Sequence, residues 1–213
     1  MELVEAETLG EAWLEVARRI LVRGADAEWD GSPTREVALL TLAVARPDPA
    51  DPLVAELGDP DWLRWMHENF FVPKEVAELG GAASYASRLF DYDGSGRDQI
   101  GWVVERLRAN PEARDAAITT FQPRTDTTYI PCVSLLDFWL RDGAVELVVY
   151  AHSLDFGKKA YGNLVELARL QEHVARQLAA AAGRLVVHVK TAHIYEPEWA
   201  AMDELCARIA PVT

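Results

Sequence analysis

Residues 163–195, NLVELARLQEHVARQLAAAAGRLVVHVKTAHIY, contain the clearest helix pattern of the chain, followed directly by its clearest strand pattern. Over 163–182, apolar residues recur three or four positions apart, as on one face of a helix: Leu164, Leu167, Ala168, Val174, Ala175 and Leu178. Over 185–195 the pattern alternates, and a strand would place on one face Leu185, Val187, Val189, Thr191, His193 and Tyr195. The two patterns together predict a domain in which helices and strands are combined.

The same two patterns predict further elements before residue 163. Helices are expected over 10–22 and 98–110, the second capped by Asp98, and a short helix is expected from residue 61. Strands are expected over 37–45, 116–121, 132–140 and 146–151, with a hairpin turn at 141–143. Residues 30–35 are expected to form a turn and residues 46–60 a loop. No internal repeat or linker divides the chain, so residues 1–213 are predicted to form a single α+β domain.

The composition excludes several classes of protein. The 213 residues include 21 Lys and Arg against 34 Asp and Glu, a formal net charge of −13, so general nucleic-acid binding is not expected. A local basic patch could still bind one small anion. No run of about 18 apolar residues predicts a membrane-spanning helix. The acidic start, MELVE, is unlike a signal peptide, so a cytoplasmic location is expected, with Cys132 and Cys206 as free thiols.

Several polar residues follow Cys132 at positions where elements begin or end. Cys132 comes after a proline at the start of a predicted strand, where a small buried apolar residue is the simpler interpretation. Downstream lie Asp155 near a strand end, Asn163 at a helix start and His193 at another strand end. Taken singly, these three fit a turn residue, a helix N-cap and a buried histidine. Their joint occurrence after Pro-Cys points instead to a nucleophilic cysteine in a polar pocket.

The spacing of these residues resembles the thymidylate synthase family over most of the chain. The family's Pro-Cys is matched by Pro131-Cys132, its aspartate by Asp155 at an interval of 23, its asparagine by Asn163 eight further on, and its His-x-Tyr by His193 and Tyr195. Asp98-Gln99-Ile100, Asn110 to Arg114 and Tyr85 resemble further family segments. The N-terminal part is most similar to the compact archaeal synthases and the pyrimidine nucleotide hydroxymethylases.

The resemblance implies a fold, a chemistry and a set of roles. The fold would be α+β, with a mixed, largely antiparallel sheet and helices packed on one side. Cys132 would add as a thiolate to C6 of a pyrimidine, which makes C5 able to attack a one-carbon unit from 5,10-methylenetetrahydrofolate. Asp155 and Tyr85 would be the other catalytic residues. Substrate would be bound by Asn163 at the base, His193 and Tyr195 at the sugar, and Ser153 near the phosphate.

The resemblance also implies a homodimer formed through the sheets. In the family about four arginines hold the 5′-phosphate, and Arg114 would reach the partner's pocket. Arg35 is a looser match. The second of the paired arginines is Asp115 here, and a third is His152, which is only partly charged near neutral pH. Lys158 and Lys159 could compensate or could simply be solvated.

Three functions stay open from the sequence. Asparagine at position 163 suits the N3–H and O4 of uracil, so methylation of a uracil nucleotide with a reduced folate is the first expectation. Hydroxymethylation of UMP, CMP or dCMP is the alternative, and a degenerate nucleotide-binding homologue is the second alternative. The family's general-acid glutamate has no counterpart that can be placed. Trp62 and Trp65 resemble tryptophans on the folate side, with core packing as the simpler interpretation, and no metal is expected.

Overall fold

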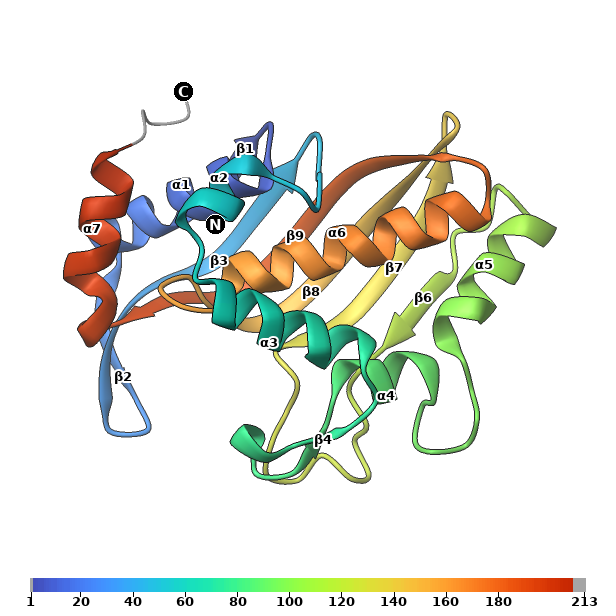
Figure 1. Ribbon diagram of the computed structural model, residues 1–213, viewed down its shortest axis with the longest axis horizontal. Coiled ribbons are helices and arrows are strands. Elements are labelled where there is room, and N and C mark those ends of the chain that lie inside the picture. Colours follow the sequence, from blue (N-terminus) through green and yellow to red (C-terminus); the bar gives the residue numbers. More distant parts are fainter. Residues whose placement is uncertain (1, 209–213) are drawn as a thin grey trace.

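The computed structural model describes residues 2–208 and is organised around one mixed sheet (Figure 1). The strands are β1 (Glu2–Ala6), β2 (Ala25–Trp29), β3 (Ser32–Val44), β6 (Ala116–Thr119), β7 (Val133–Arg141), β8 (Ala144–Asp155) and β9 (Ala181–Tyr195). Their order is β1-β3-β9-β8-β7-β6, with β2 paired to β3, and the β1–β3 and β8–β9 pairs are parallel. Two very short strands, β4 (Glu75–Val76) and β5 (Ala82–Ala83), pair with each other. The mixed, largely antiparallel sheet confirms the predicted fold class.

Helices cover one face of this sheet. They are α1 (Leu9–Arg23), α2 (Pro52–Leu57), α3 (Pro60–Phe71), α4 (Tyr85–Phe90), α5 (Gln99–Ala109), α6 (Ala160–Gln177) and α7 (Trp199–Ala207), with single turns at Ala77–Leu79 and Glu196–Glu198. Figure 1 shows α6 lying across the central strands, with α3 beside its beginning. On the other face, Leu135, Trp139 and Tyr150 are exposed. The predicted helices over 10–22 and 98–110 are confirmed, and Asp98 caps the second through the N–H of Gly101.

The three central strands share an aligned interruption of their pairing. The residue pairs between β3, β9 and β8 omit Leu39, Lys190 and His152, and Leu39 has a φ of 55°, in the left-handed region that leucine rarely adopts. The core positions of β9 change there, from Leu185, Val187 and Val189 before the interruption to Ala192 and Ile194 after it. The prediction of a single face over 185–195 is therefore wrong, although His193 and Tyr195 still share a face.

Helix α6 begins and ends earlier than its apolar pattern predicted. It starts at Ala160 because a hydrogen bond from Trp13 Nε1 to the carbonyl of Phe156 (2.9 Å) holds the preceding turn against α1. The ring of Trp13 also packs on Tyr161, with ring centroids 4.5 Å apart. The helix stops at Gln177 because Ala179 takes a φ of 53° and the chain enters β9 at Ala181.

Two further predictions need correction, and two strands were not predicted. The predicted loop over 46–60 contains α2, which Asp51 caps while also accepting a hydrogen bond from the N–H of Gly10 (3.1 Å). The predicted turn over 30–35 is confined to Asp30 and Gly31, because Ser32 already belongs to β3. β1 and β2 were not predicted, since each has only five residues. Within residues 2–208, no helix has both the length and the apolar character needed to cross a membrane.

The hydrogen bond of Trp13 yields a stability prediction. Trp13→Phe keeps an aromatic ring near Tyr161 but leaves the buried carbonyl of Phe156 without its donor. We expect a loss of about 1–3 kcal/mol in the free energy of unfolding, measured by urea denaturation. Trp29→Phe is the matched control, because Trp29 is 69% exposed and should change stability little. Equal stability of Trp13→Phe and the wild type would contradict the anchoring role of this bond.

Candidate active site

The beginning of β7 and the ends of β8 and β9 carry polar side chains and lie at the same end of these neighbouring strands. β8 lies between β7, which is antiparallel to it, and β9, which is parallel. The residue before β7, Cys132, therefore lies beside the end of β8, and the N–H of His152 donates to the carbonyl of Cys132 (3.0 Å). On the other side of β8, the register pairs Asp155 with His193. The topology thus brings Cys132, Asp155 and His193 to one place.

The backbone at Cys132 is held by Tyr85 as well as by β8. The hydroxyl of Tyr85, a buried residue of α4, accepts a hydrogen bond from the N–H of Val133 (3.0 Å). The loop that leads to Cys132 is anchored by Arg88, whose guanidinium makes two bonds of 2.7 Å to the buried carboxylate of Asp126. Both α4 and this loop therefore position the cysteine.

Burial and two charged neighbours set the acidity of the cysteine. Burial raises the pKa of the Cys132 thiol, the nearby Lys159 ammonium lowers it and the Asp155 carboxylate raises it. Burial is the largest of the three effects, so the thiol form predominates at neutral pH. Any nucleophilic role for Cys132 requires a local positive charge, because the thiolate is the reactive form.

The polar residues at the ends of β8 and β9 contact one another. Ser153 Oγ lies 3.2 Å from His193 Nδ1, and the rings of His193 and Tyr195 meet edge to face with centroids 5.1 Å apart. Burial is the main cause that raises the pKa of the Asp155 carboxyl, and the charge of Glu198 acts in the same direction. This cluster can hold hydroxyl groups and the polar edge of a ligand.

Asn163 lies in the first turn of α6 and is 5% exposed. It is not the helix cap, because Lys159 occupies that position and the N–H of Asn163 donates to the carbonyl of Lys159 (3.1 Å). The side-chain Nδ2 lies 3.4 Å from the sulfur of Met66, a weak acceptor. The N-cap interpretation of Asn163 is therefore wrong, and its buried amide is short of strong partners.

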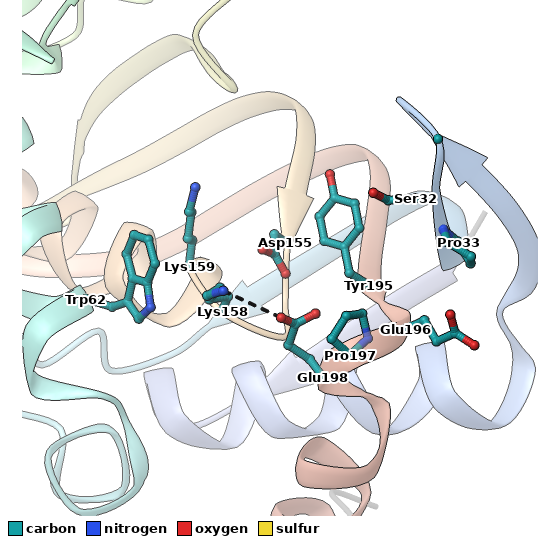
Figure 2. Close-up of a pocket in the computed structure, with 11 residues that line it drawn as sticks. Ser32, Pro33, Trp62, Asp155, Lys158, Lys159, Tyr195, Glu196, Pro197 and Glu198 are labelled. Carbon is teal, nitrogen blue, oxygen red and sulfur yellow. Dashed lines mark ion pairs between the residues drawn. The ribbon is translucent and has the colours of Figure 1, made fainter. Parts of the chain in front are cut away.

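A cavity of about 370 Å³ adjoins this cluster (Figure 2). Asp155 and Tyr195 come from the strand ends, Lys158 and Lys159 from the start of α6, and Trp62 from α3. Gly31 from the turn before β3, Ser32 and Pro33 at the start of β3, and residues Glu196–Glu198 complete the wall. Lys158 Nζ lies 3.6 Å from Glu198 Oε1, and Lys159 Nζ lies 5.1 Å from the ring centroid of Trp62. The cavity therefore combines an aromatic surface with charges of both signs.

Comparison with known proteins shows the family of the chain. The family model for thymidylate synthase matches residues 53–212 of the chain. The chain belongs to the thymidylate synthase family. It is 30% identical to a protein of Methanococcoides burtonii named "Putative thymidylate synthase", over 95% of this chain and 94% of that protein. It is also 30% identical to proteins of the same name from Methanosarcina barkeri (95% and 94%) and Methanopyrus kandleri (92% and 94%).

Not every residue suggested by the family resemblance lies at this cavity. The guanidinium of Arg35 lies 4.2 Å from the ring centroid of Trp199 and donates to the carbonyl of Leu21, away from Cys132. Arg114 is exposed just before β6, the strand at the far edge of the sheet. Beside it, Asp115 forms two hydrogen bonds with Arg106 (2.9 and 2.6 Å). Within residues 2–208, neither Arg35 nor Arg114 lines the cavity.

Two residues near the strand ends are not among the site residues expected from the sequence: Glu198, which lines the cavity, and Tyr129, which lies near Cys132 and does not line it. Glu198 follows Tyr195 by only three residues, which is the signal that could have found it. Its buried Oε2 accepts no hydrogen bond within residues 2–208. Tyr129, three residues before Cys132, has its pKa raised by burial and by the neighbouring thiol. Trp65, by contrast, packs edge to face on Trp62, and its ring does not line the cavity.

Histidine stands at position 152, where the family resemblance predicts an arginine. This histidine carries little positive charge near neutral pH. Burial and the positive charge of Lys190 lower the pKa of His152 below its usual value of 6.5. Its Nδ1 lies 3.4 Å from Ser134 Oγ. The imidazole is therefore mostly neutral at pH 7 and cannot replace the missing arginine as a cation.

This lowered pKa can be measured directly. In an NMR titration of the five histidines, we expect His152, identified by loss of its signal in His152→Asn, to titrate below pH 6.5. Lys190→Gln should raise the His152 pKa, because it removes a neighbouring positive charge. A wild-type value at or above 6.5 would contradict this account of the site.

Proposed function

We propose that this protein transfers a one-carbon unit to C5 of a uracil nucleotide, with Cys132 as the nucleophile. The observation that supports it is the convergence of Cys132, Asp155 and His193 where β7, β8 and β9 end, with Asn163 on the helix that follows β8. Methylation is the proposed outcome, in line with the names of the archaeal relatives. Hydroxymethylation is the alternative if water reaches the transferred carbon.

The chemistry gives each residue a task. The Cys132 thiolate would form a bond to C6, and the electron pair of the C5–C6 bond would make C5 nucleophilic. Asn163 can offer one acceptor and one donor to the N3–H and O4 of uracil. His193 and Tyr195 would bind the sugar hydroxyl, and Asp155 would lie near the base. Tyr85 would keep Cys132 in place through the N–H of Val133.

The cavity is suited to a reduced folate as co-substrate. Trp62 offers a flat aromatic surface, and the ammonium groups of Lys158 and Lys159 lie within 5.5 Å of its ring centroid, where they could attract an acidic tail. 5,10-Methylenetetrahydrofolate would supply the carbon at the oxidation level of formaldehyde. After C5 loses its proton and the bond from Cys132 to C6 breaks, the tetrahydrofolate would donate the hydride that completes the methyl group and would leave as dihydrofolate; in the alternative, water adds in place of the hydride. Trp65 would support Trp62 from behind, with their rings 5.6 Å apart.

We also propose that the chain forms one domain and assembles as a homodimer through the uncovered face of the sheet. Leu135, Trp139 and Tyr150 are exposed on this face, which a second copy could bury. The dimer would allow Arg114 of the partner subunit to approach the 5′-phosphate beside Ser153. Arg35 is left out, because its guanidinium stacks on Trp199. A cytoplasmic location would keep Cys132 reduced, as the chemistry requires.

Release of tritium from 5-³H-labelled pyrimidines tests the proposed function. The panel comprises dUMP, UMP, dCMP, CMP and the nucleosides, each with methylenetetrahydrofolate, and we expect release from a uracil nucleotide. Cys132→Ser should abolish release because it removes the nucleophile. Cys206→Ser is the control, since Cys206 is buried in α7 against the carbonyl of Leu14. Absence of release from every compound would favour a nucleotide-binding homologue without catalysis, and turnover by Cys132→Ser would exclude the mechanism.

Asn163 provides a separate prediction about the base. Asn163→Asp should move the preference from uracil toward cytosine, because the carboxyl group matches the 4-amino group better than O4. The expected change is on the order of 1–3 kcal/mol, the cost of a mispaired buried polar group. The ratio of kcat/KM for matched uracil and cytosine nucleotides measures it. A wild type that already prefers cytosine would refute the uracil assignment.

A further inference from the structure

Lys159 has an unusual environment for a lysine. It lies directly before α6, is half-buried, and has its ammonium 5.1 Å from the ring centroid of Trp62 and 5.5 Å from that of Trp65. Neighbouring Lys158 pairs with Glu198, whereas Lys159 forms no ion pair within the described part of the chain. Aromatic faces attract an ammonium without cancelling its charge. Lys159 therefore brings to the cavity a positive charge that no ion pair within residues 2–208 holds, with the Asp155 carboxylate as a neighbouring charge.

The backbone joins Lys159 to the end of β8 and to Asn163. The N–H of Lys159 donates to the carbonyl of Asp155 (3.1 Å), and the carbonyl of Lys159 accepts from the N–H of Asn163 (3.1 Å). Lys159 and Asn163 are four residues apart and so lie on the same side of α6. Figure 2 shows Lys158 directed toward Glu198 and Lys159 directed away from it. Lys159 thus lies between the residues that end β8 and the buried asparagine.

We propose that Lys159 is a positioning residue that supplies the positive charge needed to keep Cys132 reactive. The proposal rests on the proposed nucleophilic role of Cys132. Lys159, directly before α6, would thus supply the positive charge that the neutral His152 of β8 does not supply.

The other groups that face the thiol do not supply this charge. Asp155 from β8 opposes thiolate formation, and the thiol is further surrounded by Tyr85 from α4, Tyr129 from the preceding loop and Tyr195 from β9. Burial raises the pKa of each of these tyrosines, so all three are neutral near pH 7. Among the described residues that shift the pKa of Cys132, Lys159 is the one cation.

The test is the pH dependence of alkylation at Cys132, which needs neither substrate nor folate. Iodoacetamide labelling of Cys132 is followed by mass spectrometry in the wild type, Lys159→Met, Lys159→Arg and Lys158→Met. Lys159→Met keeps an apolar chain over the tryptophans and should raise the midpoint by about one pH unit, which slows labelling at pH 7.5 by about tenfold. Lys159→Arg should retain the wild-type profile, and Lys158→Met should leave it unchanged.

Two results would overturn the proposal: a Lys159→Met profile that coincides with the wild type, or an equal shift in Lys158→Met.

If Lys159→Met fails to fold, a comparison of two labelling reagents on the wild-type protein tests the proposal instead. A nearby cation should raise the rate of labelling by anionic iodoacetate relative to neutral iodoacetamide above the ratio measured for the chain unfolded in urea, and an unchanged ratio overturns the proposal. Tritium release without a Lys159 effect would refute this inference alone, and a Lys159 effect without release would refute the proposed function alone.

Discussion

The pairing of β8 with two neighbours of opposite direction is the constraint on which the candidate site depends. Because β7 is antiparallel to β8 and β9 is parallel, the beginning of one strand and the ends of the two others meet at a single edge. The N–H of Phe156 then donates to the carbonyl of His193 (2.8 Å), and Trp13 binds the carbonyl of Phe156. These bonds connect the end of β8 to β9 and to α1 before α6 begins. The placement of Cys132, Asp155 and Asn163 therefore depends on backbone hydrogen bonds of the strand ends and of the turn before α6.

Those parts of the fold that depend on local signals could be predicted from the sequence. Asp98 caps the helix that follows it, and Asp142 and Gly143 form a hairpin turn. In both cases the residue types indicate where the element begins or turns. The left-handed conformation of Leu39 has no such signal, because only its neighbours in the sheet impose it. Glu198 likewise reaches the cavity through the turn after β9, which no periodicity in the sequence reveals. Spacing alone made Cys132 and Asp155 candidates and noted Lys158 and Lys159 near them, but it did not indicate that Glu198 pairs with Lys158 while Lys159 has no ion pair within residues 2–208.

The overall negative charge of the chain says little about the charge at the cavity, because neighbouring groups pair locally. Asp115 would be unfavourable near a phosphate, yet Arg106 neutralises it by two hydrogen bonds. Lys158 is similarly paired with Glu198. What remains near the thiol is Lys159, which favours the thiolate, and Asp155, which opposes it. A chain with a net charge of −13 can thus contain a site in which one lysine and one aspartate have opposite effects on the pKa of the cysteine.

The aligned interruption at Leu39, Lys190 and His152 makes the length of β9 as important as its composition. Before it, the aliphatic side chains that enter the core are odd-numbered, and after it Ala192 and Ile194 take that place. If β3 and β8 kept their interruption, deleting one residue of β9 there would move each later residue by one position, so that His193 would take the core position of Ala192 and Ile194 would take the position of His193. The number of residues between Val189 and His193 is therefore a stricter requirement for the site than the identity of their side chains. An alignment gap at that point would mark a protein that has lost the site, whatever residues it retains.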